Sequence, residues 1–137
     1  MIKTLCIGEI LWDIFPDKKV WGGAPANFIF HTAQFGADAT AYTAIGNDAL
    51  GKEILSAVKA SGIKLHAEEL NYPTGKVDIN IDHEGLAEYN FNENCAWDHI
   101  PTTETLVNLS AEADLIAFGS LAQRSKISRQ TIRKALE

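Results

Sequence analysis

The sequence predicts an α/β fold, in which helices cover a mostly parallel sheet and a separate β-hairpin is attached. Short apolar runs alternate with amphipathic helical patterns over the first sixty residues, which is typical of a covered parallel sheet. Apolar and polar residues then alternate between residues 77 and 91 on both sides of a turn, which predicts the hairpin. The 137 residues, 46% of them hydrophobic, suffice for one domain with a sizeable core.

The chain begins with two short strand patterns and a helix. Residues 5–8 form an apolar run that ends in glycine, as a buried strand does, and residues 10–15 form a second run that contains one acid. A turn follows at residues 16–19. Pro25 suits the first turn of a helix, and Gly36 suits its end.

The next strand and helix complete a βαβα order. Residues 39–45 predict the strand, Asp48 can cap the helix that follows, and Gly62 can end it. In the earlier helix one face is expected to hold Phe28, Thr32 and Phe35, with Ile29 and Ala33 beside them.

The second half predicts a different arrangement. The alternation over 77–81 and 87–91 indicates a half-buried hairpin outside the helix-covered sheet, which needs a ligand, the main domain or a second subunit over its apolar face. A short helical segment is expected at 104–109, a buried strand at 114–119, and a last helix capped by Ser125 or Ser128. The pattern stops in mid-helix, which predicts missing sequence, although a frayed terminal helix is common.

Composition narrows the possible partners. The net charge of −6 argues against a nucleic-acid footprint, which needs clustered Lys and Arg. Cys6 is expected to be a small buried residue, and two cysteines make no disulfide scaffold. The four histidines are scattered, so no metal site is expected. The N-terminus lacks a signal-peptide core and no apolar run approaches the ~18 residues of a membrane span, so we expect a cytoplasmic protein without membrane contact.

A motif near the N-terminus carries residues that suit a sugar, which presents hydroxyls in a fixed array. A carboxylate such as Asp13 can accept hydrogen bonds from two neighbouring hydroxyls, and an amide such as Asn27 can donate and accept at once. Gly22 and Gly23 allow the backbone to approach a ligand closely. Pro25 begins a helix whose first amides face the site.

Each residue of this motif also has a plain structural interpretation. Asp13 suits the outward face of an edge strand, the glycine pair suits a simple turn, and Asn27 suits a helix cap. The whole constellation is more specific than any of its parts.

The stretch from residue 22 to 46 resembles the first signature of the PfkB (ribokinase-like) carbohydrate kinases. The glycine pair, Pro25, Asn27, Gly36 and Gly46 recur at that signature's spacing. Residues 45–51 are similar to the family as well, as is Gly8-Glu9 followed by Asp13, while 96–98 and 118–122 are similar to its fructokinase-type members. The signature has a small residue where this chain has Ile29, which we expect to be a packing change in a retained site.

The resemblance implies a Rossmann-like ribokinase fold, of which residues 1–137 are the N-terminal part and the C-terminal part is missing. It implies that Asp13 and Asn27 bind sugar hydroxyls and that Gly22 and Gly23 contribute backbone. Arg124, just after the C-terminal end of a predicted strand, is a candidate further polar contact, and it equally suits a solvated cation in the first turn of a helix. Segments of about 10–21 and 74–100 would form a lid that excludes water, and the lids of two subunits would clasp each other in a homodimer.

The chemistry of a kinase needs more than this sugar site. Phosphoryl transfer requires a phosphate cradle, a metal site and a base, and the resemblance places the glycine-rich anion hole and the catalytic aspartate beyond Glu137. ATP and Mg²⁺ are therefore expected for the complete enzyme, and neither is expected to bind this chain alone. Gly46, Gly51 and Lys52 fit P-loop spacing, but Glu53 stands where Ser or Thr should hold magnesium.

Three hypotheses follow from the sequence. The first is the sugar-binding part of a fructokinase-like, ATP-dependent sugar kinase. The second is a truncated, catalytically inactive module that binds sugar or dimerises through its hairpin. The third, ranked last because of Glu53, is a nucleotide-binding domain that uses residues 46–52.

Overall fold

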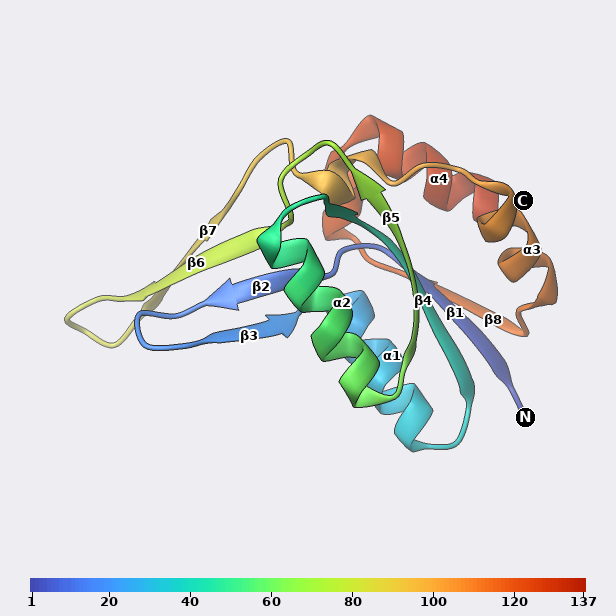
Figure 1. Ribbon diagram of the computed structural model, residues 1–137, viewed down its shortest axis with the longest axis horizontal. Coiled ribbons are helices and arrows are strands. Elements are labelled where there is room, and N and C mark those ends of the chain that lie inside the picture. The colour runs from blue at the N-terminus through green and yellow to red at the C-terminus, as the bar shows by residue number, and fades with distance from the viewer.

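The computed structural model describes all of residues 1–137 and contains two four-stranded sheets (Figure 1). The main sheet is parallel throughout and has the strand order β5-β4-β1-β8. Its strands are β1 (Lys3–Ile7), β4 (Asp38–Gly46), β5 (Lys64–Leu70) and β8 (Leu115–Phe118). The predicted α/β class with a covered parallel sheet is confirmed.

Helices cover both faces of the main sheet (Figure 1). α1 (Ala24–Gln34) and α2 (Ala49–Ser61) share one hydrophobic core, to which they contribute Ile29 and Ile54. α3 (Glu104–Glu112) and α4 (Lys126–Leu136) share the other, with Leu106 and Ile132. The two central strands, β1 and β4, are thus enclosed on both faces, as the β-α alternation of the sequence requires.

The helix ends follow the predicted capping chemistry in part. Asp48 caps α2 by accepting from the Gly51 N–H, and Gly62 ends that helix in the left-handed conformation, as predicted. Ser125 stands at the N-cap position of α4 but makes no capping bond. Its hydroxyl donates instead to the Asp98 carbonyl.

The second sheet projects from one end of the main sheet (Figure 1). Its strand order is β3-β2-β6-β7, in which β2 and β6 are parallel and the outer pairs are antiparallel. The strands are β2 (Leu11–Ile14), β3 (Lys19–Gly22), β6 (Lys76–Ile81) and β7 (Ala87–Phe91). The hairpin expected between residues 77 and 91 is therefore present and lies outside the main sheet.

Polar contacts attach the second sheet to α2. The Trp12 indole N–H donates to the Leu50 carbonyl (2.9 Å), and Lys19 pairs with Glu53. At the start of β6, the Thr74 N–H and hydroxyl both donate to the Asp48 carboxylate (2.9 and 2.6 Å). Residues at the beginning of α2 thus hold the two sheets together.

The structure differs from the predictions in several elements. β3 and β5 were not predicted, and β8, expected as a buried strand, leaves Leu115 and Phe118 45% and 47% exposed. Phe28 and Thr32 of α1 and Phe35 at its C-cap line a shallow cavity of about 330 Å³ beside Leu115, and Phe35 is 91% exposed. The reason is that β8 is the last strand at its edge of the sheet, so no neighbour covers this side. None of the helices has the length and apolar character to cross a membrane.

Candidate sugar site

Asp13 and Gly22 are diagonal neighbours across the β2–β3 hairpin. The antiparallel register pairs Asp13 with Val20 and Leu11 with Gly22. A Cβ atom added at Gly22 would lie 2.9 Å from Asp13 Oδ2. Glycine at this position therefore leaves room for the carboxylate. The pairing of β2 with β3 thus places two residues of the sequence motif, Asp13 and Gly22, side by side.

Gly23 joins this hairpin to the first turn of α1. It occupies the N-cap position with φ of 105°, a conformation that favours glycine. A Cβ atom there would lie 2.5 Å from the Glu9 carbonyl oxygen, so the position is closed to other residues. The Asn27 N–H donates to the Gly23 carbonyl (2.9 Å), and the Asn27 residue is exposed one turn into the helix.

The structure thus brings Asp13, Gly22 and Gly23 together and places Asn27 on the adjoining helical turn. Partial burial raises the pKa of Asp13, and no hydrogen bond or ion pair within the chain acts on that carboxyl. The first amides of α1 carry the partial positive charge of a helix N-terminus. An acceptor without an internal partner, beside the N-terminus of α1, can bind a ligand that carries several hydroxyls.

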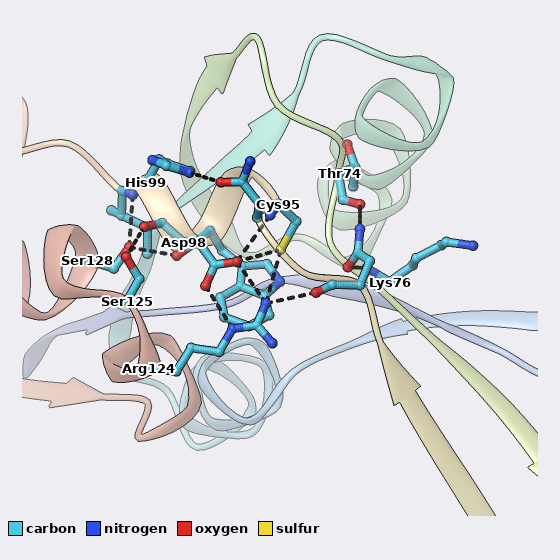
Figure 2. A network of polar contacts seen from close by, with 12 residues as sticks. Thr74, Lys76, Cys95, Asp98, His99, Arg124, Ser125 and Ser128 are labelled. Atoms are coloured by element: carbon cyan, nitrogen blue, oxygen red, sulfur yellow. Dashed lines mark hydrogen bonds and ion pairs between the residues drawn. The ribbon is translucent and has the colours of Figure 1, made fainter.

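Arg124 lies in a different network, which joins η1 (Ala96–His99) to η2 (Leu121–Arg124) (Figure 2). Its guanidinium donates from Nε and Nη2 to the two carboxylate oxygens of Asp98, both at 2.8 Å. Nη2 also donates to the Asn92 carbonyl (2.8 Å), and the guanidinium stacks over the Trp97 ring at 4.0 Å.

This network is electrostatically matched. Burial acts to raise the pKa of Asp98, but the hydrogen bonds from Arg124 and the Cys95 N–H outweigh it and hold that pKa below its ordinary value. The hydrogen bond to Asp98 raises the pKa of Arg124 in turn. Arg124 has partners within the protein on several sides, and its role as a sugar contact stays a prediction.

The glycine-lysine loop at residues 46–52 does not fit the phosphates of a nucleotide. The Gly46 N–H donates to Thr74 Oγ1 (2.9 Å), and the Gly51 N–H donates to Asp48 Oδ1 (2.8 Å). A Cβ added at Gly51 would lie 2.2 Å from the Gly46 carbonyl oxygen. These two amides already donate hydrogen bonds within the protein. The Asp48 carboxylate accepts one of them and so takes the place that a phosphate oxygen would have.

Sequence reasoning assigned no role to one buried group beside the glycine pair, Glu9. Its side chain lies at the end of β1 against Gly119, and in the sequence it was noted only as part of the Gly8-Glu9 pair in the family resemblance. No three His, Cys, Asp or Glu side chains gather in a way that could hold a metal ion.

Comparison with known proteins places this geometry in a family. The family described as pfkB family carbohydrate kinase matches residues 14–135. An ATP-dependent 6-phosphofructokinase of Thermoanaerobacterium thermosaccharolyticum is 24% identical over 141 residues, which cover 94% of this chain and 43% of that protein.

Solved structures share the fold. An uncharacterized sugar kinase from Pyrococcus horikoshii matches with a TM-score of 0.85 at 20% identity, over 97% of this chain and 48% of that one, and was also solved in complex with ATP. A fructokinase from Halothermothrix orenii matches with a TM-score of 0.85 at 17% identity, over 98% and 52%. The chain therefore spans about half the length of the proteins that it matches.

Proposed function

Because this chain belongs to the pfkB family of carbohydrate kinases, we propose that the complete protein transfers a phosphoryl group from ATP to a hydroxyl of a small sugar. Residues 1–137 supply the sugar-binding part. The observation that carries this proposal is the Asp13 carboxylate, which is partly buried against Gly22 and has no partner within the chain. The acceptor is fructose-like, because residues 96–98 and 118–122 are similar to fructokinase-type sequences.

Each of the four residues of the site makes a different contact with the sugar. Asp13 accepts from two neighbouring hydroxyls through charge-assisted hydrogen bonds. Asn27 donates and accepts on the same ring, and Gly22 and Gly23 let the backbone come within contact distance. The sugar is held at the carboxyl end of β1, where ligands of parallel sheets generally bind. One hydroxyl is left to face the phosphoryl donor.

The second sheet serves as a lid over this site, with segments of about 10–21 and 74–100. Asp13 belongs to β2 of that sheet, so the sheet and the sugar contact move as one piece. Closure of such a lid keeps water from competing with the sugar hydroxyl for the phosphoryl group. The apolar side chains that remain exposed on this sheet support a homodimer in which two lids meet; they are Val20, Ile81, Leu86, Tyr89 and Phe91.

The phosphoryl donor and the catalytic base belong to the remainder of the complete protein. The loop at 46–52 does not fit phosphates, so ATP, with the Mg²⁺ that phosphoryl transfer ordinarily requires, binds elsewhere. The uncovered edge of β8 supports a sheet that continues there. α4 lies on the face opposite α1, and a right-handed crossover from β8 through α4 places the next parallel strand at that free edge.

Calorimetric titration of the chain with fructose and related sugars tests this proposal. Asp13→Ala is compared with Asp17→Ala, an exposed acid in the same hairpin. A hydrogen bond to a charged group contributes about 1.5–3 kcal/mol, so Asp13→Ala should weaken sugar binding by about tenfold or more, while Asp17→Ala leaves it unchanged. Equal affinities of the two variants would refute the site. No sugar binding at all, with dimers intact, would favour the inactive dimerising module.

A further inference from the structure

Glu9 keeps a carboxyl group in the protein interior without full hydrogen bonding. The residue follows β1 and Gly8, and only 2% of its surface is exposed. Its Oε2 atom is buried and has no hydrogen-bond partner. Buried polar atoms nearly always have a partner, because an unpaired one costs free energy of folding. A group retained under these conditions calls for an explanation.

Three glycines close the space around this carboxyl. A Cβ added at Gly119 would lie 2.6 Å from Glu9 Oε2, and one added at Gly23 would lie 3.4 Å from Glu9 Cγ. At Gly8 an added Cβ would lie 2.6 Å from Pro25 Cγ and 3.2 Å from the Gly119 nitrogen. The end of β1, the first turn of α1 and the turn after β8 therefore meet at Glu9 as closely as their backbones allow.

The Glu9 carboxyl also interacts with the backbones of the two segments it separates. The backbone amides of Ala122, after β8, and of Ala24, in the first turn of α1, together with the amide of Glu9 itself, act to lower the pKa of this carboxyl. The Glu9 side chain thereby connects the turn that carries Gly23 with the turn after β8 that carries Gly119. The Glu9 side chain lies between these two turns, with its Cγ beside Gly23 and its Oε2 beside Gly119.

We propose that Glu9 is a positioning residue of the sugar site, which holds the first turn of α1, with Gly23 and Asn27, at its distance from the ends of β1 and β8. The inference rests on the proposed function, because only there do Gly23 and Asn27 bind sugar. Glu9 itself does not touch the sugar, since its carboxyl is enclosed by Gly119 and Gly23.

The charge state of Glu9 is in keeping with this role. Burial raises its pKa, while the backbone amides and the charge of Arg124 act in the opposite direction and offset part of the rise. The other titratable group that faces it is Cys6 on β1, whose own pKa is raised to about 12, first by burial and then by Glu9. Glu9 therefore keeps its proton to a higher pH than an exposed glutamate.

A purely structural role makes a different prediction from a positioning role. If the carboxyl served only stability, its replacement by an apolar side chain of similar length would lower stability. If the protein keeps an unpaired polar atom for the sake of the site, Glu9→Met should leave stability equal or higher and still weaken sugar binding, because the link between the two turns is lost.

The experiment compares Glu9→Met and Glu9→Gln with Ile54→Val, a mild core change in α2. Urea unfolding gives stability, calorimetry gives fructose affinity, and amide chemical shifts report on Ala24 and Ala122. We expect Glu9→Met to lose about tenfold or more in affinity at unchanged or higher stability, since small misplacements of binding groups have effects of this size. Glu9→Gln, which keeps an acceptor, should stay within about threefold of wild type, and Ile54→Val should lose stability alone.

Two results would overturn the inference. Either Glu9→Met binds fructose with wild-type affinity, or Glu9→Met loses affinity only in proportion to its loss of stability. The amide shifts separate this test from the proposed function. If the wild-type chain binds no sugar, the proposed function fails, and the link is still tested by whether Glu9→Met moves the shifts of Ala24 and Ala122. Unmoved shifts would refute the link, and moved shifts in Glu9→Met, absent from Ile54→Val, would support it.

Discussion

Removal of the Arg124 side chain is expected to destabilise the fold through the charge that it leaves behind. Asp98 is 6% exposed and receives both 2.8 Å bonds of the guanidinium fork, while it also accepts from the Cys95 N–H. Arg124→Ala leaves this carboxylate in a nearly closed site with one amide donor. It also removes the guanidinium from the Trp97 ring, over which it lies at 4.0 Å.

The magnitude follows from how far the pair is buried. Breaking a fully buried ion pair costs about 3–5 kcal/mol, but the Arg124 side chain is 31% exposed, so solvent screening reduces this to about 2 kcal/mol. Loss of the stacking contact adds about 1 kcal/mol. Arg124→Ala should therefore lower the free energy of unfolding by about 3 kcal/mol, or Tm by roughly 10 °C for a chain of this length.

Urea denaturation of Arg124→Ala, Asp98→Asn and the double variant measures this as a cycle. The double variant should lose less free energy of unfolding than the sum of the two single losses, by at least about 1 kcal/mol. The reason is that each single substitution leaves the other residue of the pair without its partner. Additive losses would refute the reasoning. If Arg124→Ala kept its stability and lost affinity for fructose, the predicted sugar contact would be favoured over the structural role.

Other predictions follow from the same contacts. Asp48→Ala removes the acceptor shared by Gly51 and Thr74 and should cost about 2 kcal/mol in urea unfolding, against almost nothing for the exposed Asp17→Ala. The pKa of Asp48 is lowered, because its hydrogen bonds outweigh burial, so the stability that it contributes is present above pH 3.8 and should be lost as the pH falls through its lowered pKa in acid unfolding curves. The pKa of Glu9 is raised above 4.5, so its contribution to stability is largest below pH 4.5 and declines as the pH rises through the raised pKa. Glu9→Gln should remove this decline. Parallel curves of stability against pH for wild type and Glu9→Gln would contradict the prediction. The chain alone should show no ATP-dependent phosphorylation of fructose in a coupled assay, and measurable turnover would refute the assignment of donor site and base to the remainder of the protein. If the exposed edge of β8 mediates self-association of the chain, Phe118→Lys should reduce that association in analytical sedimentation. An unchanged sedimentation profile would argue against association through this edge.

Much of the fold could be predicted because its signals are local. The Asp48 cap and the Gly62 stop mark α2 within one stretch of chain, and the alternation of residues 77–91 marks the hairpin. β3 and β5 were missed for the same reason. β3 has four residues and is held by its pairing with β2, and β5 is an edge strand with mixed polarity, so each depends on a partner and not on its own pattern.

The candidate site divides in the same way. Asp13, Gly22, Gly23 and Asn27 could be named from a short motif, because their chemistry and spacing are visible within fifteen residues of sequence. Glu9 could not be assigned a role, because its carboxyl is enclosed by Gly119, which lies far away along the chain. The partners of Arg124 are equally distant in sequence.

The sequence by itself determined the α/β class, the resemblance to carbohydrate kinases and the residues suited to sugar hydroxyls. Only the tertiary structure decided that Arg124 is paired with Asp98, that β8 leaves an uncovered edge, and that three turns of the backbone meet at the Glu9 carboxyl. The physical reason is that capping, turns and hydrophobic periodicity act between neighbours in the chain. Desolvation and hydrogen bonding of a buried charge depend instead on which distant segments enclose it.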